Sequence, residues 1–306
     1  MTDRDDPTAE LRAAHQRFLE LVKTLRPDLH RYCARMTGSV IDGEDLVQDT
    51  LARAYVELSQ LRELPALRSW LFRIAHHRAI DLLRRPERRA PAEPLGDDDD
   101  LPAEVPDAEA RLIRSETVGL AIARFAPLPP TQRAAVILKD VIGHSLEEIA
   151  DLLDTTVPAV KAALHRGRLR LGPPAAVADA ARDTPPPSPA LLRYTALFNS
   201  RDWDGVRSML VSDVKLDLVS REKRRGLADV SRYFENYGSI TGWHLSPGWL
   251  EGREVIVVHT APEGRRLRYV VELELDGDRV AAIRDFRYVP YVLDDAVLVE
   301  APAPGP

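Results

Sequence analysis

The sequence predicts a multidomain protein in which two all-α blocks precede an α+β block. Three observations lead to this fold class. Hydrophobic residues recur at helical spacing through the first 172 residues. Proline-rich stretches interrupt the chain at about 86–107 and 173–189. Beyond residue 210 the pattern changes to the alternation and the β-branched runs that are typical of strands.

Length and composition limit the class of protein. A chain of 306 residues predicts two or three domains, and its hydrophobic share of 44% and charged share of 29% are typical of soluble globular proteins. No apolar run approaches the roughly 18 residues needed to span a bilayer, so no membrane contact is expected. The acidic N-terminus lacks the order of a secretory signal, which favours a cytoplasmic location. Cys33 stands alone, so neither a disulfide nor a metal site or cofactor is expected.

The net charge of −6 excludes a protein that coats nucleic acid by bulk electrostatics, but the charge is unevenly distributed. Residues 68–89 hold seven arginines against two acidic residues, a balance of +5. Residues 90–117 hold nine acidic residues against two arginines, a balance of −7. Residues 161–172 hold four bases and no acid. Two basic segments separated by an acidic one suggest two contact points on a polyanion.

The first block, 10–86, is helical by periodicity. Asp42 is expected to cap a helix whose buried stripe comprises Val47, Leu51, Ala54, Tyr55 and Leu58. After Pro65 a second helix is expected to bury Leu67, Leu71, Ile74, Ala75 and Leu82. The opposite face of that helix carries Trp70, Arg73, His77 and Arg84. Apolar packing does not explain an outward tryptophan among arginines.

An acidic linker, 87–107, leads to the second block, 108–172. This block is expected to begin with a helix of about 108–125 and to continue with a helix over 132–140. Ser145 and Glu148 have the spacing of a capping box, so a helix is expected to start at Ser145. A polar turn at 154–156 and a further helix from about Val157 complete a helix-turn-helix, whose second helix enters the major groove of DNA with its N-terminus first.

A proline-rich linker, 173–189, precedes the third block, 190–300. Helices are expected over about 190–200 and around Val206 to Leu210. Strands are expected over 214–219, 254–259, 267–275 and 280–288, with a hairpin turn at 276–278. Helices followed by a meandering antiparallel sheet predict an α+β block. The tail after Glu300 is expected to be disordered.

Several segments of the first two blocks resemble bacterial sigma factors of the sigma-70 superfamily, extracytoplasmic-function type. Residues 42–51 (DGEDLVQDTL) and 70–85 (WLFRIAHHRAIDLLRR) look like the family's region 2. Residues 128–138 (LPPTQRAAVIL), 145–150 (SLEEIA) and 161–168 (KAALHRGR) look like its region 4. The resemblance covers the first 172 residues and implies a protein, not an enzyme, that directs transcription initiation.

The resemblance implies two partners, core RNA polymerase and promoter DNA. Docking on the β′ clamp helices is assigned by position to Asp45, Leu46, Gln48 and Asp49, while region 4 would contact the β flap. A solvated helix face is the simpler alternative for these four residues. The loop of about 59–66 matches the family's pocket for a flipped base. The acidic linker either threads toward the polymerase active-site cleft or serves as a plain tether.

The DNA contacts are also carried over by position. The minus-10 element is assigned to Trp70, Phe72, Arg73, His76, His77, Arg78 and Arg84, because aromatic faces stack on unpaired bases and arginines neutralise phosphates. Trp70 as a core residue is the alternative. The family commonly has Asn where His77 stands. The minus-35 element is assigned to Thr156, Lys161, His165, Arg166 and Arg168. These residues must carry more of the binding, because Ala159, Ala162 and Ala163 stand where the family often has polar residues.

The third block resembles the SnoaL-like, ketosteroid-isomerase-like cone fold, and the resemblance implies a regulatory domain whose pocket could hold an unknown small ligand. Asp217, His244, His259, Asp285 or a tyrosine could serve an acid–base reaction there, but no fixed spacing marks a catalytic residue. The alternative function is a ligand-sensing helix-turn-helix regulator, or an enzyme that uses this pocket. Such a regulator would shift duplex DNA without polymerase.

Overall fold

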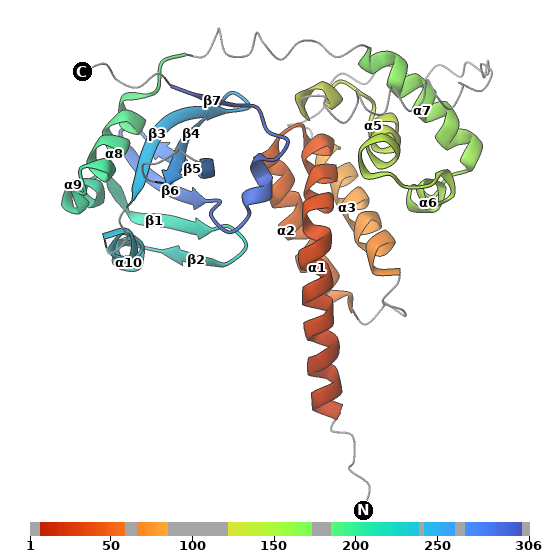
Figure 1. Ribbon diagram of the computed structural model, residues 1–306, viewed down its shortest axis with the longest axis horizontal. Helices are drawn as coiled ribbons and strands as arrows, with labels where there is room; N and C mark the ends of the chain where they lie inside the picture. The colour runs from red at the N-terminus through yellow and green to blue at the C-terminus, as the bar shows by residue number, and fades with distance from the viewer. Residues whose placement is uncertain are drawn as a thin grey trace, which may run out of the picture. The chain divides into compact units, whose positions relative to one another are not determined.

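The structure is a computed structural model that describes residues 7–58, 66–84, 122–172, 185–238, 242–260 and 267–301. The chain forms two compact units, Met1–Ala175 and Ala176–Pro306 (Figure 1), so the first two predicted blocks belong to one unit. Five predicted features lie outside the described residues, in whole or for the most part: the acidic linker, the helix at 108–125, the pocket loop, the proline-rich linker and the C-terminal tail.

The N-terminal unit begins with three helices, α1 (Pro7–Thr37), α2 (Val40–Val56) and α3 (Leu67–Leu83). The N-cap of α2 is Ser39, whose side chain accepts a hydrogen bond from the Asp42 amide at 3.4 Å. The predicted cap at Asp42 is therefore wrong. Asp42 lies instead in the first turn, where its carboxylate interacts favourably with the positive end of the helix dipole.

The buried faces of α2 and α3 agree in part with the sequence, since predicted core residues Leu51 and Leu58 are only half-buried. Val47 and Ala54 of α2 are fully buried, and the predicted inward residues of α3 are buried except Leu82, which is half-buried. Tyr55 is 58% exposed, so its predicted place in the core is wrong. The buried face of α2 also includes a polar residue, Thr50. Its hydroxyl is satisfied, because it donates to the Leu46 carbonyl at 2.7 Å.

Five further elements complete the N-terminal unit: η4 (Ile122–Phe125), α5 (Pro130–Val136), the π-helical η5 (Ile137–Ile142), α6 (Leu146–Leu152) and α7 (Val157–Leu171). The helix predicted over 132–140 is therefore an α-helix that widens into a π-helix. The capping box is confirmed, because Ser145 Oγ accepts from the Glu148 amide at 3.0 Å and the Ser145 amide donates to Glu148 Oε2 at 2.7 Å. Helices α6 and α7 form the predicted helix-turn-helix.

One hydrophobic core joins the three N-terminal helices to the helix-turn-helix. Its members come from every helical segment of the unit, among them Leu29, Tyr32, Met36, Phe72, Phe125, Val136, Ile149, Val160 and Leu164. The guanidinium of Arg133 lies within it and donates to the carbonyls of Met36 at 2.6 Å, of Leu128 at 2.9 Å, and of Ala126. Burial lowers the pKa of Arg133 to about 10, which leaves it a cation at neutral pH.

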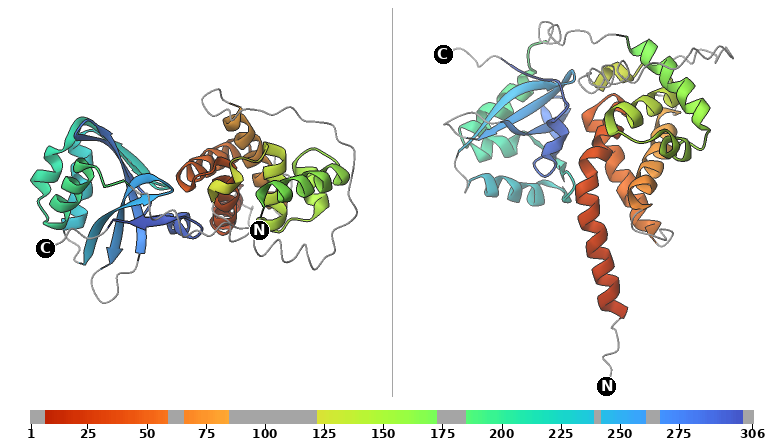
Figure 2. Two further views of the ribbon diagram at one scale, coloured as in Figure 1. Left: turned by 90° about the horizontal axis from the view of Figure 1, so that it is seen from above. Right: turned by 45° about the vertical axis from the view of Figure 1, so that its right-hand side comes forward.

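The C-terminal unit packs helices on one face of a curved sheet (Figure 2). Its elements are α8 (Pro189–Asn199), α9 (Trp203–Ser208), β1 (Leu210–Leu218), β2 (Glu222–Arg225), α10 (Leu227–Gly238), β3 (Trp243–Leu250), β4 (Arg253–Thr260), β5 (Leu267–Asp276), β6 (Arg279–Asp285), η7 (Pro290–Leu293) and β7 (Leu298–Glu300). The strand order is β2-β1-β6-β5-β4-β3-β7. The core lies between the sheet and the helices.

The α+β architecture of this unit is confirmed, but the predicted antiparallel meander is only partly right. Strand β1 runs parallel to β6, so the sheet is mixed. The strand predicted to end at residue 288 ends at Asp285. Strand β3 (WHLSPGWL) was not predicted, because proline and glycine interrupt its alternation. Helix α10 and the short strands β2 and β7 were also missed.

We expect Gly43→Ala to destabilise the full-length protein by about 2–3 kcal/mol through overpacking. A Cβ atom at this position in α2 would lie 2.5 Å from Ala34 Cα and 2.6 Å from Ala34 N, both backbone atoms of α1. Urea unfolding followed by circular dichroism measures the effect. The control is Ala52→Gly on the exposed face of α2, which should cost about 1 kcal/mol. Equal losses in the two variants would contradict the close packing of α1 and α2.

Candidate nucleic-acid interface

Helix α7 presents a basic exposed face. Its N-cap Thr156 accepts a hydrogen bond from the Ala159 amide at 3.3 Å. Lys161 and Arg166 are exposed, and His165 is half-buried. The opposite side of α7 packs tightly, since a Cβ atom at Gly167 would lie 2.7 Å from the Val136 side chain. The structure thus places four of the five predicted minus-35 residues at or near the surface of the second helix of a helix-turn-helix.

The fifth residue, Arg168, is held inside the unit. Its Nε donates to Asp140 Oδ2 at 2.9 Å and its Nη2 donates to Asp140 Oδ1 at 2.6 Å. The Asp140 carboxylate is fully buried, so it requires this bidentate partner. The DNA contact predicted for Arg168 is therefore replaced by an ion pair that fastens α7 to η5.

Helix α3 carries the predicted minus-10 residues, and two of them are not available at the surface. Phe72 is 1% exposed and packs edge-on against Tyr32, with ring centroids 5.7 Å apart. The predicted stacking of Phe72 on a base is wrong, because its ring faces are enclosed. His76 Nδ1 lies 2.9 Å from Tyr32 Oη, and burial lowers the pKa of His76 to about 4. His76 is therefore neutral at neutral pH and contributes no charge toward a phosphate.

Trp70 is half-buried at the edge of a small hydrophobic cluster. The cluster joins α1, α2 and α3 and contains Phe18, Val22, Ala54, Leu67, Leu71 and Ile74. Part of the indole therefore anchors α3, while part remains accessible to solvent. The two interpretations of Trp70, core residue and stacking surface, are compatible with this position.

Three of the remaining predicted cations of α3 already have partners, and the fourth, Arg84, is the exposed C-cap residue of the helix. Arg78 Nε donates to Asp49 Oδ2 of α2 at 2.6 Å. Arg73 Nη2 donates to the Asp151 carbonyl at the end of α6 at 3.1 Å. His77 Nε2 lies 3.7 Å from Asp154 Oδ2 in the turn before α7. The outward face of α3 is thus in contact with the helix-turn-helix.

Helix α2 presents an acidic and apolar stripe. Asp45 and Asp49 are exposed and Gln48 is half-buried. Leu46 is a member of the hydrophobic core at 5% exposure, so the polymerase contact predicted for Leu46 does not agree with its burial. Sequence reasoning missed exposed Ala52 and Val56, of which Val56 is 74% exposed. Their spacing of seven and eleven residues from Asp45 was the signal that could have found them.

Among the described residues of the C-terminal unit, one carboxylate is buried. Asp285 is 1% exposed and accepts hydrogen bonds from Tyr233 Oη at 2.9 Å, Tyr237 Oη at 3.1 Å and the Arg287 amide at 2.9 Å. Tyr237 Oη lies 2.7 Å from Tyr269 Oη. Burial raises the pKa of Asp285, and the hydrogen bonds oppose that shift. The cavity beside this cluster is lined mainly by aromatic and aliphatic side chains.

The other candidate acid–base residues of this unit lie in separate places. Asp217 lies 3.5 Å from the Lys223 ammonium. His259 Nε2 lies 2.9 Å from Ser246 Oγ and 3.1 Å from Glu300 Oε2. His244 pairs with His259 in the register of β3 and β4. Among the described residues, no group of three or more His, Cys, Asp or Glu side chains could hold a metal ion.

Comparison with known proteins identifies the family. The family models of sigma-70 region 2 and of sigma-70 region 4 match residues 21–89 and 122–171. SigW of Bacillus subtilis is 32% identical over 164 residues, which cover 49% of this chain and 84% of SigW. SigG of Mycobacterium tuberculosis is 35% identical over 261 residues, which cover 76% of this chain. The chain belongs to the extracytoplasmic-function RNA polymerase sigma factors. It spans 62% of the length of SigG.

Solved structures give weaker likenesses. Extracytoplasmic-function sigma factor SigJ of Mycobacterium tuberculosis has a TM-score of 0.35 and 20% identity, covering 87% of this chain and 95% of SigJ. Bal32a from a soil-derived mobile gene cassette has a TM-score of 0.28 and 20% identity, covering 35% of this chain and 92% of Bal32a. In the described part of this chain, no helix is long and apolar enough to cross a membrane.

We expect Arg168→Ala to destabilise the protein by about 3–5 kcal/mol, because it leaves the buried Asp140 carboxylate without a counter-charge. Arg166→Ala, on the exposed face of the same helix, should leave the free energy of unfolding unchanged. Urea unfolding measures both variants. The double variant Asp140→Asn/Arg168→Gln should recover part of the loss, since it removes both buried charges. Equal stability of the two single variants would contradict the structural role of Arg168.

Proposed function

We propose that this protein is a promoter-specificity subunit that binds core RNA polymerase, reads two promoter elements and helps to open the duplex. The observation that carries the proposal is the presence, in one chain, of both sigma-70 regions, each with a basic exposed face on a helix. Its place of action is then the cytoplasm, where polymerase and promoters are found. The proposal assigns the chain no catalysis and no cofactor.

We assign promoter contacts to the surface residues of α7 and α3. In the minus-35 element, Thr156, Lys161, His165 and Arg166 contact the major groove and its phosphates, and each phosphate contact adds about 0.9 to the dependence of log affinity on log salt. In the minus-10 element, the accessible part of Trp70 stacks on an unpaired base, a contact worth about 1–3 kcal/mol. Arg73, His77, Arg78 and Arg84 follow the backbone. Arg73, His77 and Arg78 must first leave the partners described above.

The polymerase contact is assigned to the stripe of α2. Asp45, Gln48 and Asp49 supply carboxylates and an amide for basic side chains of the β′ clamp helices, and Ala52 and Val56 extend the contact with apolar surface. The β flap is the proposed partner of region 4. The proposed domain boundaries are 10–86 for region 2, 108–172 for region 4 and 190–300 for the regulatory domain, joined by linkers at 87–107 and 173–189.

The C-terminal unit is proposed to regulate the sigma regions. Asp285 accepts hydrogen bonds from two tyrosine hydroxyls and one amide. Both tyrosines belong to the hydrophobic core of the unit, so we assign Asp285 a structural role and the unit a regulatory one. A small ligand in the neighbouring cavity would have to displace side chains that line it.

Run-off transcription with core RNA polymerase on a promoter library tests the proposal. Promoter-specific transcripts that require the full-length chain support it. A chain that shifts duplex DNA without polymerase and gives no transcript would instead be a helix-turn-helix regulator.

We expect Val56→Asp to weaken the binding of core polymerase at least tenfold, because it places a charge in the apolar part of the α2 stripe. Val56 is 74% exposed, so the fold should be unaffected. Affinity is measured by fluorescence anisotropy of the labelled full-length chain. Leu192→Asp on α8, which likewise replaces an exposed aliphatic residue, is the control and should bind as the wild type does. Unchanged affinity for Val56→Asp would remove Val56 from the interface.

We expect a chain that ends at Pro187 to transcribe the same promoters at a different level. The sigma regions form one compact unit with a hydrophobic core of its own, so they should retain their helices without the third block. Circular dichroism checks the helices, and run-off transcription compares the two chains. Equal output from both chains would contradict a regulatory role for the C-terminal unit.

A further inference from the structure

His144 is buried where the helix-turn-helix meets α3. It directly precedes α6, is 3% exposed and packs edge-on against Phe72 of α3, with ring centroids 5.2 Å apart. Its Nδ1 lies 3.3 Å from Glu148 Oε2. Its Nε2 is buried and has no hydrogen-bond partner among the described residues. A titratable group with one unsatisfied nitrogen therefore lies buried between the helix-turn-helix and α3.

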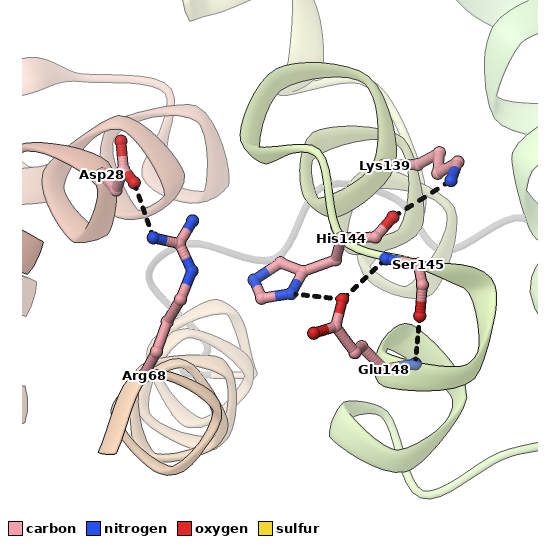
Figure 3. Close-up of polar contacts among 6 residues, drawn as sticks. All are labelled: Asp28, Arg68, Lys139, His144, Ser145 and Glu148. Atoms are coloured by element: carbon pink, nitrogen blue, oxygen red, sulfur yellow. Dashed lines mark hydrogen bonds and ion pairs between the residues drawn. The ribbon is translucent and has the colours of Figure 1, made fainter. Parts of the chain in front are cut away.

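The charged groups around His144 come from each element packed on it (Figure 3). Helix α3 supplies Arg68, whose Nη1 donates to Asp28 Oδ2 of α1 at 2.9 Å. Residue Lys139 of η5 donates through Nζ to the His144 carbonyl at 3.1 Å. Helix α6 supplies Glu148, whose Oε2 already accepts the Ser145 amide. Burial lowers the pKa of His144, and the positive charge of Arg68 acts in the same direction. The carboxylates of Glu148 and Asp28 oppose this shift.

Protonation of His144 is unfavourable in this contact. A proton on Nε2 would create a buried cation without a hydrogen-bond acceptor, and burying an unpaired charge is costly. Glu148 is the opposing carboxylate, but its side chain is 51% exposed, so solvent screens its attraction. The imidazole therefore stays neutral while the contact is closed.

The same contact engages two exposed side chains that are assigned above to DNA. Arg73 and His77 of α3 are engaged by the Asp151 carbonyl and the Asp154 carboxylate, which lie at the end of α6 and in the following turn. A nucleic-acid strand on this face of α3 must replace these contacts. The helix-turn-helix is therefore positioned to exclude the strand from α3 as long as the two stay packed.

We propose that the contact of His144 with α3 is an autoinhibitory latch that a proton opens. While His144 is neutral, the helix-turn-helix stays on α3 and keeps its contacts with Arg73 and His77, and protonation of His144 releases it. The exclusion of DNA rests on the proposed function, whereas the opening of the contact does not.

The direction of the pH effect follows from the difference in the pKa of His144 between the closed and the open contact. The pKa of His144 is near 6.5 when the residue is exposed and lower when the contact is closed. The closed form is therefore fully favoured above pH 6.5 and loses stability as the pH falls below that value. Each unit of pKa difference changes the ratio of closed to open forms about tenfold. Burial lowers the pKa of His76 to about 4, so His76 stays mainly neutral at pH 5.5.

Distance measurement between spin labels tests the latch in the full-length chain. Cysteines replace two exposed residues, Ala52 of α2 and Leu169 of α7. Native Cys33 is retained, because it is fully buried and burial raises the pKa of its thiol. We expect one short distance at pH 7.5 and an added longer population, at least threefold above background, at pH 5.5. No change between pH 7.5 and 5.5 would overturn the proposal.

Variants assign the response to His144. His144→Leu should keep the short distance at both pH values, and His144→Phe serves the same purpose should the leucine variant fail to fold. His144→Arg, which is charged at both pH values, should give the longer population at pH 7.5. His244→Leu, in β3 of the C-terminal unit, is the control and should respond as the wild type does. A wild-type pH response in both neutral variants would overturn the role of His144.

Binding of a single-stranded minus-10 oligonucleotide tests autoinhibition. We expect His144→Arg to bind at least fivefold more tightly than the wild type at pH 7.5. A latch that opens in the distance measurement without any gain in strand binding would overturn the autoinhibitory role. Failure of the proposed function is distinguishable, because it would appear as absent run-off transcripts at every pH while the distances still respond.

Discussion

The N-terminal unit depends on one shared hydrophobic core, to which α1 contributes the side chains that both α3 and the helix-turn-helix need for burial. Met36 and Phe125 are fully buried in it, and the guanidinium of Arg133 satisfies the Met36 carbonyl in the last turn of α1. Buried carbonyls without a donor are costly, so Arg133 and the apolar side chains favour the same arrangement. This shared core holds α3 against α6, and that packing brings Arg73 of α3 to the Asp151 carbonyl of α6.

Several arginines of the basic segments of this unit form hydrogen bonds or ion pairs within the protein itself. Arg78, Arg73 and Arg168 were equivalent as cations in the sequence, but each has a different partner in the fold: an exposed carboxylate, a backbone carbonyl and a buried carboxylate. The first two contacts lie near the surface. The third is buried, because the Asp140 side chain has no exposed surface and Arg168 is its counter-charge. The surface positive charge is therefore smaller than the count of arginines.

The C-terminal unit uses its polar groups to close its interior. Three tyrosines and Asp285 form a chain of hydrogen bonds beneath aromatic rings such as Phe198 and Trp243, which pack edge-on around them. A buried carboxylate is tolerated there because its acceptors are filled. This arrangement accounts for the stability of a carboxylate in the cone without assigning it a reaction.

The sequence by itself determined α2, α3, the capping box at Ser145, the helix-turn-helix and the α+β class of the third block, because periodicity and capping are local properties. It did not predict helix α1. It could not determine that Phe72 is enclosed, that His76 pairs with Tyr32, or that Arg168 pairs with Asp140. These partners lie 44 and 28 residues apart, and Arg133 reaches Met36 across 97 residues. Burial and ion pairing depend on residues distant in the chain, so only the tertiary structure decided which residues of the two basic helices remain at the surface.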